Sequence, residues 1–352
     1  MSTTSEAPTF VPVAPKWSLR SVVPADVLRP ARFTLMGMYL AAYLYWLRFK
    51  GLPIDRISVA ISVGLFLVCA FVGRSWRTWG VLLLDCLAYC AMWYSYEATR
   101  GAADRGVLGL DPFPLQVESV RNIDRVLFLG HDPNVVLQNH FYQPGVVRWY
   151  DVVLSTTYMT HFVLPMVIMA VLWVTSHRQW ARFMKRFATL LGIACVMFVV
   201  MPTAPPWMAA KNYHLIDPIA RPINWRGFYH LGFHGFTNDY KVQLSDGNPV
   251  AAMPSLHASF ALIVPAFFLP WVRQRWLKAT MLTFPVVMLV ALVYFGEHWV
   301  IDGLAGWVIT GGTFWYWNRR EQLTRRLRAG RARAALGAPA PAAATADDRA
   351  IT

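Results

Sequence analysis

Two histidines and one aspartate stand at the thresholds of apolar segments. The stretch Ala-Ala-Met-Pro-Ser-Leu-His-Ala-Ser-Phe (251–260) places His257 at the start of one apolar run, and Gly-Glu-His-Trp-Val-Ile-Asp (296–302) places His298 and Asp302 at the start of another. His298 and Asp302 are four residues apart, so on a helix they share one face. A carboxylate behind an imidazole fixes its tautomer and leaves the other ring nitrogen free to act as a nucleophile.

The same side chains also have a purely structural interpretation. A single histidine at a membrane interface is more often a hydrogen-bonded or snorkelling residue than a catalyst. Two histidines and an aspartate at neighbouring helix starts favour chemistry instead, because polar and charged groups at membrane depth are costly and usually functional. His257 then supplies a proton to a leaving group or takes one from an acceptor. A metal site formed by the three side chains is a further alternative, and it predicts that chelators abolish activity.

The elements that must position these residues are membrane helices. The chain has 352 residues, of which 56% are hydrophobic and only 15% charged, against about 25% charged in a typical soluble domain. Its apolar residues gather in blocks of the length that crosses a ~30 Å hydrocarbon core. We expect an all-α integral membrane protein with about eight transmembrane helices. The predicted spans are 33–49, 57–73, 79–96, 152–175, 184–202, 256–271, 278–295 and 299–317.

The charge distribution predicts the orientation of the spans. The net charge of +14 would suggest nucleic-acid binding in a soluble protein, but no phosphate loop or zinc-finger spacing supports that class. With both termini in the cytoplasm, 21 of the 33 Lys and Arg residues fall on the cytoplasmic side and 12 on the other, as the positive-inside rule requires. The loops 97–151 and 203–255 and the turn 296–299 then share the non-cytoplasmic face, in the plasma membrane if the protein is bacterial.

Four regions follow from this topology. They are a cytoplasmic N-terminal tail (1–32), N-terminal helices with an outer aromatic loop (33–150), a catalytic membrane core (151–317), and a basic, then Ala/Pro-rich, disordered cytoplasmic tail (318–352). The N-terminal tail lacks the apolar core of a secretory signal peptide.

The motif residues resemble the type-2 phosphatidic acid phosphatase superfamily. Pro254-Ser255-Leu256-His257 is followed 41 positions later by His298-Trp299-Val300-Ile301-Asp302. Within the superfamily these residues look most like the branch of inositol phosphorylceramide synthases, which has Pro-Ser-Leu-His where the phosphatases usually have Pro-Ser-Gly-His. Pro-Thr-Ala-Pro-Pro-Trp (202–207) also looks like that branch. The resemblance covers about residues 150–310.

The resemblance implies a six-helix catalytic core, no metal or other cofactor, and a phosphohistidine intermediate. By position, it makes His298 the nucleophile on phosphorus, Asp302 the residue that orients it, and His257 the general acid for the leaving alcohol and then the general base for the acceptor. Water as acceptor gives a phosphatase, and a hydroxyl gives a transferase.

The chain departs from the phosphatase pattern at its cations. Nine residues separate Lys211 from Arg221-Pro222 where that branch has six, and Ala291-Leu292 stands where that branch has Ser-Arg. Phosphoryl transfer needs cations or oriented N–H donors that stabilise the charge of the transition state, and the Lys and Arg residues of the loop could supply them. The alternative is that these residues make ordinary contacts with lipid headgroups or solvent. The candidate phosphate-binding residues are Lys211, Arg221, Arg226, Lys241 and Ser255. His161, inside its span, is expected either to line the cavity or to hydrogen-bond within the bundle.

Three functions are compatible with these residues. The first is a membrane lipid phosphotransferase that moves a phospho-headgroup, of inositol-phosphate type. The second is a lipid phosphate phosphatase acting on phosphatidic acid or an isoprenoid phosphate, and the third a non-enzymatic lipid transporter. The expected partners are a phospholipid donor, an alcohol or lipid acceptor and the membrane itself, with no nucleic acid. The oligomeric state is left open.

Overall fold

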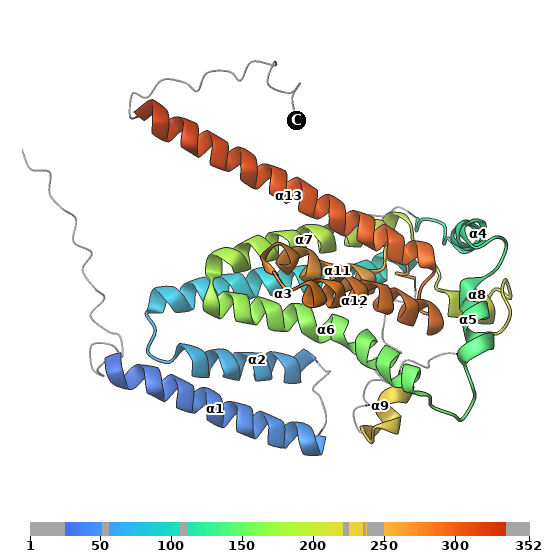
Figure 1. The fold of residues 1–352 in the computed structure, drawn as a ribbon, viewed down its shortest axis with the longest axis horizontal. Helices are drawn as coiled ribbons and strands as arrows, with labels where there is room; N and C mark the ends of the chain where they lie inside the picture. The colour runs from blue at the N-terminus through green and yellow to red at the C-terminus, as the bar shows by residue number, and fades with distance from the viewer. Residues whose placement is uncertain are drawn as a thin grey trace, which may run out of the picture. The chain divides into compact units, whose positions relative to one another are not determined.

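The computed structural model describes residues 25–50, 56–105, 111–220, 225–234, 237 and 250–335. In these ranges the chain is helical and contains no β-strand beyond two isolated bridges (Figure 1). It divides into two compact units. The first comprises residues 1–100, 145–155 and 223–248, and the second comprises residues 101–144, 156–222 and 249–352.

The first unit contains the N-terminal helices. They are α1 (Ala25–Lys50), α2 (Arg56–Phe71) and most of α3 (Trp76–Arg105), together with the short α9 (Arg226–His230). The Tyr39 hydroxyl of α1 donates to the Ser62 carbonyl of α2 at 2.8 Å. Polar partners of this kind satisfy groups that a lipid environment cannot.

The second unit contains the helices that carry the motif residues. Its elements are α4 (Glu118–Leu127), α5 (Pro133–Phe141), α7 (His177–Val200), α8 (Pro206–Lys211), α11 (Leu256–Phe268), the 3₁₀ turn η2 (Leu269–Trp271), α12 (Arg275–Tyr294) and α13 (Val300–Ala335). The helix α6 (Trp149–Thr175) begins in the first unit and continues into the second. Figure 1 shows α4, α5 and α8 gathered at the end of this unit where α13 begins.

Some of these helices are long and apolar enough to cross a membrane. Among the described residues α7 and α12 meet that requirement, and α6 adds a third span if its two halves, bent by 45° after His161, are taken together. Pro165 explains the bend, because its ring displaces the carbonyl four residues earlier and it donates no hydrogen bond. Ile61–Phe71 and Leu256–Trp271 are shorter apolar helices. The total of eight transmembrane helices stays a prediction.

The helices α11 and α13 approach each other unusually closely. A Cβ atom on Gly306 would lie 2.5 Å from the Ser255 carbonyl oxygen and 2.6 Å from the Ser259 hydroxyl. A Cβ atom on Gly303 would lie 3.6 Å from the Ala258 Cβ. Small residues at such a crossing let two backbones come together, which is how membrane helices pack without a hydrophobic driving force.

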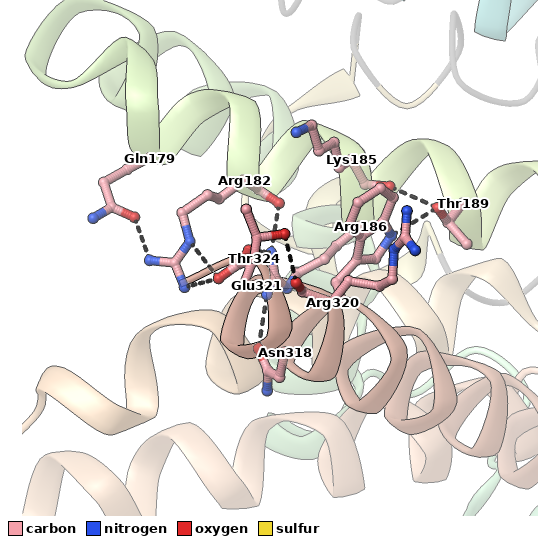
Figure 2. A network of polar contacts seen from close by, with 10 residues as sticks. Gln179, Arg182, Lys185, Arg186, Thr189, Asn318, Arg320, Glu321 and Thr324 are labelled. Atoms are coloured by element: carbon pink, nitrogen blue, oxygen red, sulfur yellow. Dashed lines mark hydrogen bonds and ion pairs between the residues drawn. The ribbon is translucent and has the colours of Figure 1, made fainter. Parts of the chain in front are cut away.

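A polar clamp joins α7 to the second half of α13 (Figure 2). Arg186, only 1% exposed, donates to Glu321 at 2.9 Å and to Asn318 at 2.7 Å, and Arg182 donates to Glu321 at 2.6 and 3.0 Å. Burial alone would raise the pKa of the Glu321 carboxyl, but the hydrogen bonds from the two arginines outweigh it, so this pKa lies below its ordinary value. The clamp therefore holds an ionised glutamate between two guanidinium groups.

The helix α13 continues well past its predicted end at residue 317. Residues 318–335, the basic first part of the predicted tail, are helical, and Figure 1 shows them projecting past the other helices of the unit. This segment is rich in Arg, Ala and Leu, which are strong helix formers, and the clamp fixes its first turn. Residues 336–352, which include the Ala/Pro-rich part of the tail, lie outside the described residues.

The α11–α13 crossing gives a prediction on stability. Gly306→Ala inserts a methyl group against a backbone carbonyl, so we expect it to lower the free energy of unfolding by about 1–3 kcal/mol. Gly311→Ala is the matched control, since nothing lies within 4 Å of a Cβ at that position of the same helix. We expect the control to retain or slightly raise stability, because alanine favours helix. Thermal unfolding of both variants in detergent checks this, and equal midpoints would contradict the close crossing.

Candidate active site

The turn between α12 and α13 carries His298 and is hydrogen-bonded to α5. Gly296 adopts a φ of +69°, a conformation that side chains disfavour. The amide of Asn134 in α5 donates to the carbonyls of Val293 at 2.8 Å and His298 at 3.0 Å, and the amide of Gln138 donates to the Tyr294 carbonyl at 2.8 Å. The two amides thus fix the backbone on both sides of the turn.

The first N–H groups of α13 are satisfied by two aspartates. Asp124 of α4, fully buried, accepts from the Val300 amide at 2.7 Å and the Ile301 amide at 2.9 Å. Asp302 accepts from the Trp299 amide at 2.8 Å. A helix start leaves such donors unpaired unless side chains accept them. The start of α13, and the histidine just before it, is therefore held from two directions.

The Pro-Thr-Ala-Pro-Pro-Trp segment (202–207) lies directly against this turn. Its Thr203 is fully buried and donates its amide to the Val250 carbonyl at 2.8 Å, in the loop that leads to His257. Trp207 donates its amide to the Gly296 carbonyl at 3.1 Å. The segment therefore connects the loops that carry the two motif histidines.

The structure brings the three predicted catalytic residues together. His257 Nδ1 lies 3.0 Å from His298 Nε2, and His298 Nδ1 lies 3.4 Å from an Asp302 carboxylate oxygen. His298 is 4% exposed and Asp302 is fully buried. One nitrogen of His298 thus faces a carboxylate while the other faces the second histidine, which is the geometry expected of an oriented nucleophile beside an acid–base group.

Two further aromatic side chains of α6 line the pair. The Tyr158 hydroxyl, on a side chain only 2% exposed, lies 3.1 Å from His257 Nε2. The His161 ring is centred 4.0 Å from the His257 ring, and its Nδ1 hydrogen-bonds the Tyr158 carbonyl. His161 therefore bonds within its own helix and contacts His257, while a role in lining a substrate cavity stays a prediction.

Sequence reasoning missed four residues that build this site. Asp124, Asn134 and Gln138 lie in the loop 97–151, where the sequence indicated no candidate residue, and their contacts cross more than 150 residues of chain. Tyr158 sits three residues before His161 on the same helix. That spacing is the one signal that would have found it, given His161 as a site residue.

The described candidate phosphate-binding residues differ in burial and do not all lie in the same unit. Lys211 is exposed at the end of α8, whereas Arg226 lies in the first unit, where it is buried, hydrogen-bonds the Val146 carbonyl and lies 3.7 Å from Asp151. The Ser255 hydroxyl, fully buried, accepts from the Ala258 amide and caps α11. Arg221 and Lys241 lie outside the described residues.

Two further observations bear on the departures from the phosphatase pattern. Ala291 and Leu292, at the position of the Ser-Arg pair, are both fully buried in α12. Among the described residues no group of three or more His, Cys, Asp or Glu side chains is arranged to hold a metal ion. The phosphate-binding roles of all five candidates stay predictions.

The buried cap on α13 gives a prediction with a defined pH direction. Burial raises the pKa of the Asp124 carboxyl from its ordinary value to about 6, against the opposing effect of its two N–H donors. A carboxyl with a raised pKa contributes most stability below its ordinary pKa and loses it as the pH rises through the folded value. The stability of Asp124→Asn relative to the parent should therefore increase between about pH 4 and 6, by up to about 3 kcal/mol. Unfolding at several pH values checks this, and a constant or falling difference would contradict it.

Comparison with known proteins identifies the family. A family model described as the PAP2 superfamily matches residues 119–316, more than half of the chain and the whole stretch that carries the histidine pair. No curated protein and no solved structure matches the chain. The matched region includes the apolar helices α7 and α12, in keeping with an integral membrane enzyme that acts on lipid phosphates. The chain belongs to the PAP2 superfamily.

Proposed function

We propose that the protein is a membrane lipid phosphotransferase that moves a phospho-headgroup, of inositol-phosphate type, through a phosphohistidine on His298. The observation that carries this proposal is the 3.0 Å contact between His257 Nδ1 and His298 Nε2, with the Asp302 carboxylate behind His298. Membership of the superfamily supports the broader class, a lipid phosphatase or phosphotransferase.

The reaction divides into two steps at one site. In the first, His298 Nε2 attacks phosphorus, a P–N bond forms, the P–O bond to the leaving alcohol breaks, and His257 gives that oxygen a proton. In the second, His257 takes a proton from the acceptor hydroxyl, whose oxygen attacks phosphorus and releases His298. The donor phosphate must part the two imidazoles, because the 3.0 Å contact between them leaves no room for it.

Two features support transfer to an alcohol over hydrolysis. The segments that resemble the inositol phosphorylceramide synthase branch, 202–207 and 254–257, both lie in the loops that hold the site. The cation pattern of the phosphatase branch is incomplete, since buried Ala291 and Leu292 occupy the place of its Ser-Arg pair. Lys211, with Arg221 and Lys241, is our proposal for the cations that stabilise the phosphate charge.

A lipid phosphate phosphatase is the second candidate. The specific observation in its favour is that the histidine pair and Asp302 are common to both activities, so that water in place of the alcohol suffices for hydrolysis. Phosphatidic acid or an isoprenoid phosphate is then the substrate.

The proposed location follows from the charge distribution. The positive-inside rule favours both termini in the cytoplasm and the histidine pair at the opposite face, so the donor and acceptor are expected in the outer leaflet or in the compartment beyond it.

A transfer assay tests the proposed function. Purified protein in detergent with EDTA is offered phosphatidylinositol, phosphatidic acid and an isoprenoid phosphate, each radiolabelled in phosphate, with a diacylglycerol or ceramide acceptor or myo-inositol. We expect label to move from phosphatidylinositol to a new lipid, and His298→Ala to lose about 10³-fold or more of the rate. His131→Ala, at an exposed histidine of the outer region, is the control and should retain the rate.

The other outcomes separate the alternatives. Release of free phosphate alone would establish the phosphatase. Loss of activity in EDTA would contradict the metal-independent mechanism. No turnover of any donor by the wild type would overturn the proposed function and favour the transporter.

A further inference from the structure

If both rings are neutral and Asp302 is ionised, the contacts around the histidine pair fit one order of donors and acceptors. Asp302 faces His298 Nδ1 at 3.4 Å, so that nitrogen carries the proton and His298 Nε2 carries a lone pair. The neighbouring His257 Nδ1, at 3.0 Å, must then donate. A neutral imidazole has one N–H, so His257 Nε2 accepts from the Tyr158 hydroxyl at 3.1 Å.

Ring packing also holds Tyr158 beside His257. Tyr158 is 2% exposed and its ring stacks on His257 with centroids 5.1 Å apart and planes inclined by 28°. Phe295 packs edge-on against the same tyrosine ring. The hydroxyl is thus held beside Nε2 by packing on two sides as well as by the hydrogen bond.

From this geometry we infer that Tyr158 is a positioning residue and proton relay, which keeps the Nδ1 proton of His257 directed at the substrate. The inference rests on the proposed function. Without the hydroxyl as a donor to Nε2, the Nδ1 tautomer of His257 is no longer enforced, and a proton on Nε2 faces away from His298 and cannot reach the leaving group. Sequence motifs do not mark this tyrosine, and the contact that defines it spans 99 residues.

The protons of the relay return to their starting positions over the two steps. When the P–O bond breaks, the His257 Nδ1 proton passes to the leaving oxygen and the Tyr158 hydroxyl proton moves to Nε2, so the imidazole stays neutral and a phenolate remains. A phenol is a much stronger acid than an alkyl alcohol, which makes the transfer favourable. In the second step the acceptor hydroxyl gives its proton to Nδ1, and the Nε2 proton returns to the phenolate.

His161 contributes to the same arrangement through the backbone. Its Nδ1 hydrogen-bonds the Tyr158 carbonyl, which places its ring edge-on to His257. The contact fixes the turn of α6 that carries Tyr158, just before the bend of that helix. The position of Tyr158 is therefore held by two neighbours, the apolar Phe295 and the polar His161.

A comparison of leaving groups tests the relay. Tyr158→Phe is assayed with two pairs of donors that differ only in the leaving alcohol: phosphatidic acid with 4-nitrophenyl phosphate, and phosphatidylinositol with the 4-nitrophenyl ester of inositol phosphate. We expect kcat to fall about 100-fold with the lipid leaving group. With the nitrophenyl esters we expect a change of less than about threefold, because nitrophenolate needs no proton to leave.

A matched variant and the wild type complete the design. Tyr294→Phe removes another buried hydroxyl, from a side chain 2% exposed. It should change kcat by the same factor for both donors of a pair. If Tyr158→Phe also changes kcat by the same factor for both donors, or leaves kcat unchanged for both, the relay is wrong and Tyr158 is structural. Failure of the wild type on every donor would instead overturn the proposed function.

A second measurement does not depend on the variant folding. In mixtures of light and heavy water, the wild-type rate with the alkyl donor should fall along a curve, as for two protons moving together. A linear dependence, which indicates one proton, would overturn the relay.

Discussion

The close crossing of α11 and α13 is the constraint on which the rest of the site depends. His257 begins one helix and His298 precedes the other, so the separation of the two rings is set by how near the two backbones come. Gly306 lies where any side chain would meet the Ser255 carbonyl and the Ser259 hydroxyl. The Ser255 amide in turn donates to the Asp302 carbonyl at 2.9 Å. A hydrogen-bonded histidine pair is thus a product of two helices that touch through small residues.

The turn that carries His298 interrupts the helical hydrogen bonding of two apolar helices, so its backbone carbonyl and amide groups need other partners. Buried carbonyl and amide groups that lack partners cost about 1–3 kcal/mol each. Asn134 and Gln138 satisfy the carbonyls and Asp124 the amides. The helices α4 and α5 therefore act as a polar scaffold for the turn.

Much of this could be predicted from the sequence, and the limits are physical. The residue types and spacing of His298 and Asp302 fix their shared helix face, and the apolar blocks predicted the helical class. The partners of the turn could not be found, since Asn134 and the His298 carbonyl are 164 residues apart and only the fold joins them. The apolar run ends near residue 317 and so predicts a helix end there, whereas helix formers and the Glu321 clamp extend α13 to Ala335.

The central claim is that His298 Nε2 becomes covalently phosphorylated. The most direct measurement is mass spectrometry of the protein quenched in alkali after incubation with the donor, where phosphohistidine survives. We predict a single phosphoryl-type adduct on the peptide that contains His298, which is absent in His298→Ala and disappears when an acceptor is added. An active enzyme with no adduct under single-turnover conditions, or with the adduct on His257 or His161, would contradict the account.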